Sequence, residues 1–432
     1  MYGFSIVAYH QFWASLLLAR YIRTVNPAAI IVFGGPFITI KPPTSFMRYG
    51  MADYWIKGSG EIPLLMLYRL YRGDGGFPLE DIPGIIFHDG ASLFGGKRSS
   101  FPAEQEHPPD FEGLALKPYR YDHFVTGRET LFLPYRISKG CPSMCSFCTG
   151  RLVDRYSVKS MDKVVTELDH LSRKYRTHTF QFADAAINGN PRQLAELCDR
   201  LSTDLPQIRW YSYAKVSGFD RELLAKARKA GCFALFWGVE SAYEPTIRLL
   251  GKRFDVQQMY QLMDQSIALG IKNYIHLIYN TPHESEEDTR ALIALVEKYI
   301  NSPLVVFLPQ RFLLEAHSSM FDHPERYGLS DIRQVQTSIF EREQFTFSEG
   351  GLSSEEIRAR NQRHRELLAE HLEWIRLEDL MRASDNVLVR SIPSRLLVRS
   401  ARYARRLRPF GKIRDLVVRC VESSNHRISE QM

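Results

Sequence analysis

The sequence lacks the features of a membrane-spanning or secreted protein. No apolar run approaches the roughly 20 residues that a membrane-crossing helix needs. The first 19 residues have no basic beginning, and His10 and Gln11 interrupt their apolar stretch, so we expect no secretory signal peptide. The chain has only six cysteines, and three lie in one loop, which is not the pattern of a disulfide framework. These absences predict a cytoplasmic protein whose clustered cysteines serve a metal.

The sequence also has little charge imbalance outside its last segment. Hydrophobic residues make up 44% and charged residues 24%, as in ordinary globular proteins, and the net charge is +7. Residues 390–419 contain a single acidic residue, Asp415, and ten cationic ones: Arg390, Arg395, Arg399, Arg402, Arg405, Arg406, Arg408, Lys412, Arg414 and Arg419. Leucines and alanines between them favour an amphipathic helix. Its basic face is either simply solvated, or contacts an acidic substrate, nucleic acid or a membrane surface.

The first hundred residues predict a small α/β unit. Strands are expected at 3–9, 29–33 and 53–57, the first two of them buried, with an amphipathic helix at about 12–25 and an apolar helix from 61 to about 71. Gly34, Gly35 and Gly58 follow two of these strands, where an open parallel sheet lets a ligand approach the backbone. A hairpin at about 82–96 completes the unit. We therefore place a first domain at 1–97 and a proline-containing linker at 98–130.

A regular alternation of apolar strands with loops and helices then begins. Strands are expected at 132–138, 179–184, 208–214, 232–239, 271–280 and 304–309. Asn190, followed by proline, and Ser285, which opens a capping-box pattern, are helix-start signals. We predict an α/β fold with a partial (β/α)6 parallel barrel at 131–330, in which functional side chains lie at the carboxyl ends of strands. A helical C-terminal region with the basic tail is expected at 331–432.

Cys141, Cys145 and Cys148 form a Cys-x-x-x-Cys-x-x-Cys run directly after the first strand of this barrel. Three thiolates on one loop can hold three corners of a cubane iron–sulfur cluster, and the fourth iron stays open because no fourth cysteine lies nearby. The alternative is a zinc site completed by a histidine such as His123. Zinc sites usually pair two short ligand segments, and the sequence has no second one. The loop therefore favours an iron–sulfur cluster.

The cysteine run, its place after a first strand and the six β/α repeats resemble the radical S-adenosylmethionine (SAM) superfamily over roughly 131–320. The resemblance implies that the cysteines bind a 4Fe–4S cluster whose open iron chelates SAM. It also implies that an electron from an external reductant cleaves SAM to a 5′-deoxyadenosyl radical, which abstracts hydrogen from an unreactive carbon. The expected substrate is a small molecule or a peptide, and the sequence does not identify it.

Five side chains match positions that this family uses for SAM: Phe147, Asp184, Lys215, Glu240 and Ser241. Phe147 would lie near the adenine, or shield the cluster as a hydrophobic plug. Asp184 would accept a hydrogen bond from the SAM ammonium, or cap the following loop. Lys215 would approach the methionyl carboxylate, or remain a solvated charge. Glu240, followed by Ser241 in a Gly-Val-Glu-Ser motif, would bind the ribose hydroxyls or the amino group, or form a structural pair with a lysine at the family's spacing.

The segment Asn280-Thr-Pro-His-Glu284 follows the fifth barrel strand, where relatives show Gly-x-Pro-Gly-Glu. Asn280 and His283 replace both glycines, which puts a close backbone approach to the adenine in question. Pro282 and Glu284 match the family pattern. His283 is either a proton donor or a polar surface residue.

The N-terminal unit resembles the second half of the cobalamin-binding domain that precedes the catalytic domain in many radical SAM enzymes. The matching pieces are Gly-Phe-Ser at 3–5, Gly-Gly-Pro at 34–36 and Gly-Ser-Gly-Glu at 58–61. The first two strands of that domain are absent, and no Asp-x-His-x-x-Gly run supplies a histidine to cobalt. The resemblance leaves cobalamin as a candidate cofactor, with C-methylation or a rearrangement as the outcome. The alternative is a shortened α/β domain kept for packing or partner contact.

Two other functions stay open at this point. One is an RNA-modifying radical SAM enzyme such as a methylthiotransferase, for which the sequence lacks a second three-cysteine site. The other is a non-catalytic iron–sulfur partner subunit.

Overall fold

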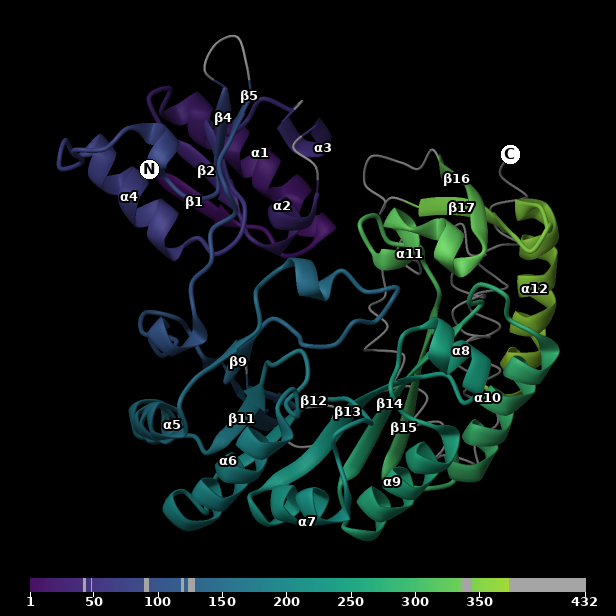
Figure 1. The fold of residues 1–432 in the computed structure, drawn as a ribbon. Coiled ribbons are helices and arrows are strands. Elements are labelled where there is room, and N and C mark those ends of the chain that lie inside the picture. Colours follow the sequence, from purple (N-terminus) through teal and green to yellow (C-terminus); the bar gives the residue numbers. More distant parts are fainter. Residues whose placement is uncertain are drawn as a thin grey trace, which may run out of the picture.

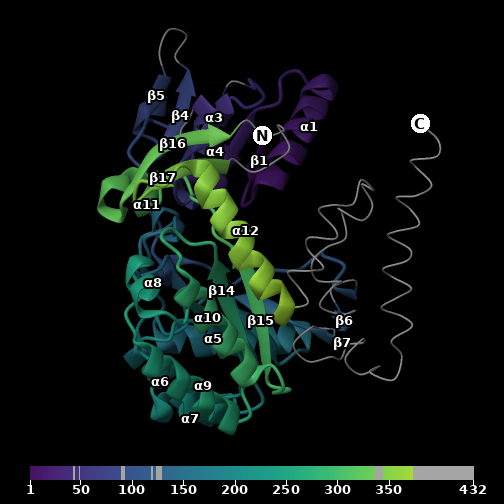
Figure 2. The same ribbon diagram turned by 90° about the vertical axis from the view of Figure 1, so that its right-hand side faces the viewer.

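The computed structural model describes residues 1–41, 44–47, 49–88, 93–117, 120–122, 129–335 and 344–372. Two α/β units follow one another along the chain (Figure 1). The N-terminal unit, purple to blue, lies above a larger unit that runs from teal to green. A C-terminal hairpin and a long helix, light green to yellow, extend along one side of the larger unit (Figure 2).

The N-terminal unit is a five-stranded sheet with the strand order β1-β2-β3-β4-β5. Its first three strands are parallel, and β4 and β5 form an antiparallel hairpin. The elements are β1 (Tyr2–Ser5), α1 (Tyr9–Val25), β2 (Ile31–Gly34), α2 (Pro36–Ile40), α3 (Thr44–Met47), β3 (Tyr54–Ile56), α4 (Glu61–Tyr71), β4 (Ile85–His88) and β5 (Leu93–Gly95). α1 packs over Phe33 and Trp55 on one face, and α4 packs around Ile56 on the other. The predicted strands and helices of this unit are present, with their ends shifted by a few residues.

The prediction that the first strand is buried is wrong. β1 is an edge strand, and Tyr2 within it is 42% exposed. The neighbouring helix α1 also exposes Leu17, Leu18, Tyr21 and Val25. A parallel strand is buried on both faces only when strands and helices flank it on both sides. Among the described residues, only β2 pairs with β1, so its apolar sequence does not become core.

The larger unit contains a six-stranded sheet with the order β15-β14-β13-β12-β11-β8, and every adjacent pair is parallel. The strands are β8 (Leu133–Tyr135), β11 (Thr179–Phe182), β12 (Arg209–Ala214), β13 (Cys232–Glu240), β14 (Lys272–Tyr279) and β15 (Val305–Arg311). All six predicted strands are present, with their ends shifted by a few residues. The sheet curves, with helices along its outer side (Figure 1).

The helices of this unit connect the strands in sequence order. They are α5 (Met161–Tyr175), α6 (Pro191–Asp204), α7 (Arg221–Lys229), α8 (Glu244–Leu249), α9 (Val256–Ala268) and α10 (Glu286–Tyr299). The predicted start signals are confirmed, because the Asn190 side chain accepts from the backbone N–H groups of α6 and Ser285 accepts from Asp288. Four short strands lie around the cysteine loop and in the predicted linker: β6 (Arg120–Asp122), β7 (Glu129–Leu131), β9 (Ser138–Lys139) and β10 (Ser157–Val158).

Side chains on the two faces of the curved sheet form separate clusters, because successive residues of a strand point to opposite faces. Trp210, Leu235 and Ile275 pack outward with the helices in the main core. Tyr211, Phe236 and Tyr274 belong to a second, aromatic cluster on the other face. The Phe236 and Tyr274 rings stack with centroids 4.3 Å apart. This aromatic cluster lines the inside of the curved sheet below its carboxyl end.

The C-terminal region contains α11 (Ser319–Asp322), β16 (Leu329–Val335), β17 (Gln344–Glu349) and α12 (Ser354–His371). The predicted helical C-terminal region is confirmed for α12, but its first part differs, because β16 and β17 form an antiparallel hairpin. β16 is largely exposed and therefore shows no apolar alternation that would have indicated a strand. The predicted capping box of α12, formed by Ser353 and Glu356, is confirmed. The expected continuation of α12 to about residue 382 and the basic tail lie outside the described residues.

Candidate active site at the cysteine loop

The cysteine loop is fixed by the elements around it. It follows β9, and Ser146 at its centre donates its backbone N–H to the Leu250 carbonyl at 3.1 Å and its hydroxyl to the Leu249 carbonyl at 2.7 Å. The Ser146 carbonyl accepts from the Met320 N–H of α11 at 2.9 Å. Gly251 lies so close that a Cβ there would be 2.8 Å from the Met144 carbonyl oxygen. The end of α8 and the start of α11 thus hold the loop at the carboxyl end of the sheet.

The three loop thiols fit the donor set of an iron–sulfur cluster. All three are free cysteines. Burial raises the pKa of the Cys145 and Cys148 thiols, their neighbouring loop thiols raise it further, and Lys252 opposes this effect. Iron binding must therefore displace thiol protons. Within the described part of the chain, no three His, Cys, Asp or Glu side chains are placed so that they could bind one metal ion together. In a cubane cluster, by contrast, each thiolate binds a different iron.

Glu240 and Lys252 form a buried ion pair beside the cysteine loop. The Lys252 Nζ lies 2.9 Å from Glu240 Oε1 and donates to the Gly238 carbonyl at 3.0 Å, and the two side chains are only 11% and 12% exposed. Burial alone would lower the pKa of Lys252, but the charges of Glu240 and the nearby Cys145 raise it. The Lys252 Nζ also lies 5.6 Å from the centre of the Phe147 ring. The pair therefore places a fixed carboxylate and an aromatic ring next to the thiols.

A backbone irregularity directs Glu240 to this position. The register between β13 and β14 shifts between Gly238 and Glu240, and Glu240 has a φ of 70°. A Cβ at Gly238 would lie 3.0 Å from the Glu240 carboxylate and 3.1 Å from Lys252 Nζ. The Gly-Val-Glu-Ser motif thus combines a glycine that leaves room for the ion pair with a bulge that turns the glutamate.

His276 lies inside the curved sheet at the same level as Gly238. Its ring is 5.7 Å from that of Tyr213 and 6.3 Å from that of Phe236. Its buried Nε2 has no hydrogen-bond partner among the described residues. Burial lowers the pKa of His276, which favours the neutral imidazole at neutral pH. A neutral donor or acceptor is therefore left on the inner wall, between the aromatic cluster and the Glu240–Lys252 pair.

Lys215 follows β12 and is half-buried. The fully buried Asn188 side chain bonds to the Lys215 backbone, accepting its N–H at 3.0 Å and donating to its carbonyl at 2.9 Å. No ion pair of the Lys215 ammonium is formed within the described residues. The backbone at Lys215 is thus fixed while its charge remains available at the carboxyl end of the sheet.

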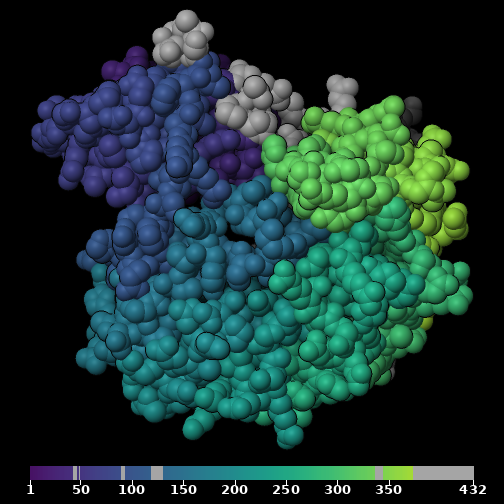
Figure 3. Space-filling view, viewed as in Figure 1, coloured from purple at the N-terminus to yellow at the C-terminus, as the bar shows by residue number. Residues whose placement is uncertain are grey.

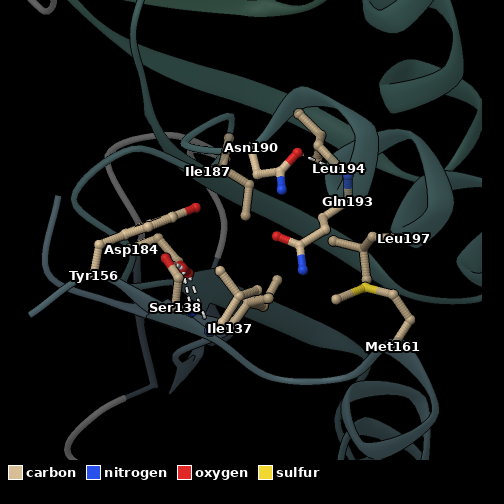
Figure 4. Close-up of a pocket in the computed structure, with 11 residues that line it drawn as sticks. Ile137, Ser138, Tyr156, Met161, Asp184, Ile187, Asn190, Gln193, Leu194 and Leu197 are labelled. Carbon is tan, nitrogen blue, oxygen red and sulfur yellow. Dashed lines mark hydrogen bonds between the residues drawn. The ribbon is translucent and has the colours of Figure 1, made fainter. Parts of the chain in front are cut away.

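The side chains of Asp184 and Ser241 are directed elsewhere. Both oxygens of the buried Asp184 carboxylate accept hydrogen bonds from the segment before the cysteine loop: Oδ1 from the Ser138 N–H and hydroxyl at 2.6 Å each, and Oδ2 from the Ile137 N–H at 3.2 Å (Figure 4). They border a small cavity of about 10 Å³, which is the size of one water molecule. Ser241 is buried and donates to Asp288 at 3.0 Å. The geometry favours a structural role for both side chains over contact with SAM.

The glycines of the N-terminal unit meet the chain's own backbone. Gly35 and Gly58 have φ angles of 94° and 95°. A Cβ at Gly35 would lie 2.7 Å from the Ile6 backbone nitrogen, and a Cβ at Gly58 would lie 2.0 Å from the Ser99 carbonyl oxygen. Gly34 has only ordinary contacts. Local folding therefore already explains the glycines at positions 35 and 58.

Lys139 connects the N-terminal unit to the cysteine loop. This lysine is 3% exposed, and its Nζ lies 2.9 Å from Glu106, 3.4 Å from Glu61 and 4.0 Å from Asp154. Ser59 in turn donates to Asp154 at 3.2 Å. The loop after β3 thus contacts the residues on both sides of the cysteine run, and the surface is hollowed near this junction (Figure 3).

Sequence reasoning missed three side chains around the site: the buried Lys139 and His364 and the half-buried His276. Lys139 stands two residues before the first loop cysteine, a position that could have drawn attention to it. His276 occupies an inward-facing position of β14, which the alternation of that strand would have indicated. His364 lies about 80 residues from its partner, Glu284, so no local pattern reveals it. His123, the zinc-ligand alternative, lies outside the described residues.

The described helices include none long and apolar enough to cross a membrane. Curated relatives of the chain include an uncharacterized methyltransferase of Pyrococcus horikoshii, 23% identical over 65% of this chain and 60% of that protein. They also include an anaerobic magnesium-protoporphyrin IX monomethyl ester cyclase of Cereibacter sphaeroides, 25% identical over 61% of this chain and 44% of that protein. The chain therefore spans only about half the length of these relatives.

Two solved structures share the fold. One is the radical SAM methyltransferase TsrM from Kitasatospora setae with cobalamin and a [4Fe-4S] cluster bound, with a TM-score of 0.59 and 20% identity over 78% of this chain and 69% of that one. The other is the cobalamin-dependent SAM radical enzyme OxsB with aqua-cobalamin and SAM bound, with a TM-score of 0.65 and 15% identity over 94% of this chain and 62% of that one.

A family model also matches the part of the chain that carries the site. Residues 135–296 match the model of the Radical SAM superfamily. This region contains the cysteine loop, the Glu240–Lys252 pair and four of the six strands of the parallel sheet, β11 to β14. The family match, the cysteine run within it and the shared fold agree with one another, and residues 135–296 of the chain therefore carry a domain of the Radical SAM superfamily.

Proposed function

We propose that this chain is a radical SAM enzyme that modifies an unreactive carbon of a small molecule or peptide. The observation that carries this proposal is the position of three free thiols beside a buried Glu–Lys pair at the carboxyl end of a parallel sheet. Cys141, Cys145 and Cys148 would hold a 4Fe–4S cluster. Once reduced by an external one-electron donor, that cluster would supply the electron that cleaves SAM to methionine and a 5′-deoxyadenosyl radical.

The residues around the thiols have distinct binding roles in this proposal. Lys252 holds Glu240 Oε1 at 2.9 Å, while the other carboxylate oxygen accepts hydrogen bonds from the ribose hydroxyls or the amino group of SAM. Lys215 supplies a positive charge for the methionyl carboxylate. Phe147, packed between Lys252 and the apolar cluster that contains Ile278, shields the cluster and borders the nucleoside. Asp184 does not bind SAM in this proposal, but orients the strand before the cysteines.

The inner wall of the sheet receives the substrate. Tyr213, Phe236 and His276 line it below Glu240, and most of their surroundings are apolar. An aromatic wall excludes water and offers few competing polar groups, which protects a reactive intermediate from side reactions. The unpartnered His276 Nε2 orients a polar group of the substrate through one hydrogen bond.

Cobalamin is the proposed second cofactor, and net methyl transfer from SAM to the substrate carbon is the proposed outcome. The fold shared with two cobalamin-dependent proteins supports this, as do relatives named methyltransferases. The loop after β3 also faces the cysteine segment through Lys139, so a ligand at the strand ends of the N-terminal unit would lie near the cluster. The local backbone contacts of Gly35 and Gly58 neither add to this proposal nor oppose it.

Anaerobic reconstitution tests the proposal. Protein loaded with iron and sulfide should contain about four of each per chain and should form 5′-deoxyadenosine from SAM when dithionite is added. Reconstitution in the presence of hydroxocobalamin should leave a bound corrinoid absorbance after desalting, and S-adenosylhomocysteine should appear if methyl groups leave SAM. A colourless protein that binds zinc and does not cleave SAM would disprove the central proposal. Cluster and cleavage without corrinoid would disprove only the cobalamin part.

A further inference from the structure

The loop between β14 and α10 adopts a backbone conformation that glycine usually provides. Asn280 has a φ of 61° and His283 a φ of 57°, both in the left-handed region. These are the two positions at which the resemblance to radical SAM enzymes implies glycine. A non-glycine residue in this region is strained, so the surrounding structure must hold it there.

The first holding contact comes from the β16–β17 hairpin. The buried Glu349 accepts the backbone N–H of His283 on Oε2 at 2.9 Å, and its Oε1 is paired with Arg360 of α12. The His283 ring adds a second contact, because its Nε2 lies 2.7 Å from the Tyr327 carbonyl oxygen. The strained residue is thus fixed through both its backbone and its side chain.

The second holding contact comes from α12 itself. The Nδ1 of His364 lies 3.0 Å from Glu284 Oε1, and these side chains are 8% and 1% exposed. The other oxygen of Glu284 accepts the Thr281 N–H at 2.9 Å, which closes the loop on itself. Thr289 of α10 donates to Glu284 Oε1 at 3.3 Å. Glu284 therefore joins the loop, the start of α10 and the C-terminal helix in one buried network.

We propose that Glu349, Arg360 and His364 form a C-terminal clamp that positions the Asn280–Glu284 loop to receive the adenosyl group of SAM. The inference rests on the proposed function, because it assigns a ligand to that loop. The clamp residues are positioning residues: they contact the loop and not the reacting atoms. This chain needs the clamp to hold its non-glycine residues at positions 280 and 283 in the left-handed conformation.

The clamp can be tested before any cofactor is loaded. Amide hydrogen exchange in the cluster-free full chain should show protected N–H groups at Thr281 and His283, because both are donated to buried carboxylates. Glu349→Ala should speed exchange at His283, and His364→Ala should speed it at Thr281. His371→Ala is the matched control, since His371 lies two turns further along α12 and pairs with the exposed Glu297 at 3.1 Å. Unchanged exchange in both clamp variants would overturn the proposal.

SAM binding by the reconstituted protein then tests the assigned ligand. His364→Ala should weaken SAM affinity about tenfold, a typical size for coupling between two parts of a protein. The rate of 5′-deoxyadenosine formation at saturating SAM should remain unchanged. His364→Gln, which can still donate to Glu284, should restore most of the affinity, and His371→Ala should bind SAM like the unaltered protein. Faster loop exchange with unaltered SAM affinity would overturn the positioning role, whereas an unaltered protein that binds no SAM would instead overturn the proposed function.

Discussion

The Glu240–Lys252 pair gives the sharpest quantitative prediction, because the same chain contains a matched lysine on its surface. Lys252 pairs with one carboxylate at 2.9 Å and lies 5.6 Å from an aromatic ring centre, with both partners nearly buried. Lys298 pairs with Asp264 at 3.0 Å and lies 4.6 Å from the Tyr260 ring centre, but its side chain is 44% exposed. The two lysines therefore differ in their exposure to water, and Lys252 also donates to the Gly238 carbonyl.

Replacing each lysine by methionine should separate the two environments. Lys252→Met leaves the Glu240 carboxylate buried without its counter-charge, and breaking a buried pair in this way costs about 3–5 kcal/mol. Lys298→Met removes a solvated pair, which costs about 0–1 kcal/mol. Glu240→Gln combined with Lys252→Met should recover part of the loss, because the unpaired charge is then gone and the aliphatic side chain fills the same space.

Urea-induced unfolding of the four proteins at pH 7.5, followed by circular dichroism, measures these differences. The midpoint of Lys252→Met should fall well below that of Lys298→Met, and the double variant should lie between them. If the two methionine variants unfold at the same urea concentration, the pair is not shielded from water as described. If the double variant is no more stable than Lys252→Met, the loss does not come from an unpaired charge.

Replacing any one of the three loop cysteines by alanine should abolish both iron loading and 5′-deoxyadenosine formation, whereas Cys198→Ala, on the buried face of α6, should keep both. Equal iron content in all four variants would contradict the cluster assignment. Burial raises the pKa of Asp288 to about 6. The folded protein therefore binds the Asp288 proton more tightly than the unfolded chain does, and the stability that this proton contributes is lost as the pH rises towards 6. The free energy of unfolding of Asp288→Asn, measured in urea and taken relative to that of the unaltered protein, should therefore increase by about 2–3 kcal/mol from pH 4 to pH 7. A difference that stays constant over this pH range would refute the raised pKa of Asp288. His283→Ala should melt below His283→Gly, because alanine bears a left-handed strain of about 1–2 kcal/mol that glycine avoids.

The sequence predicted the parallel sheet because its strands are apolar and regularly spaced. All six strands were found, and the helix caps at Asn190 and Ser285 form as expected, since both signals act over three or four residues. β1 and β16 were misjudged for one reason. Burial and pairing depend on what lies beside a strand, so an apolar edge strand and an exposed hairpin strand cannot be told from the local pattern.

The candidate site was predictable only in part, for a comparable reason. The cysteine run spans just eight residues, so the local sequence alone indicates a metal cluster there. Asp184 and Glu240 look alike in sequence, because both are carboxylates at strand ends. In the structure, Asp184 receives three hydrogen bonds from residues 137 and 138, about 46 positions earlier. Only the tertiary structure shows that both oxygens of Asp184 already accept hydrogen bonds from within the protein.

What separates these two carboxylates is backbone geometry and not residue type. Asp184 follows a regular strand end, so its side chain meets the neighbouring segment and becomes part of the framework. Glu240 follows a register shift and has a φ of 70°, which turns its side chain towards Lys252 and the cysteine loop. Such a bulge bends a strand and re-aims one side chain, and it persists only where other contacts hold it. Lys252 provides that contact by binding both the Glu240 carboxylate and the Gly238 carbonyl. The lysine therefore stabilises the strained turn and orients the carboxylate, so its loss should disturb ligand binding even where the protein remains folded.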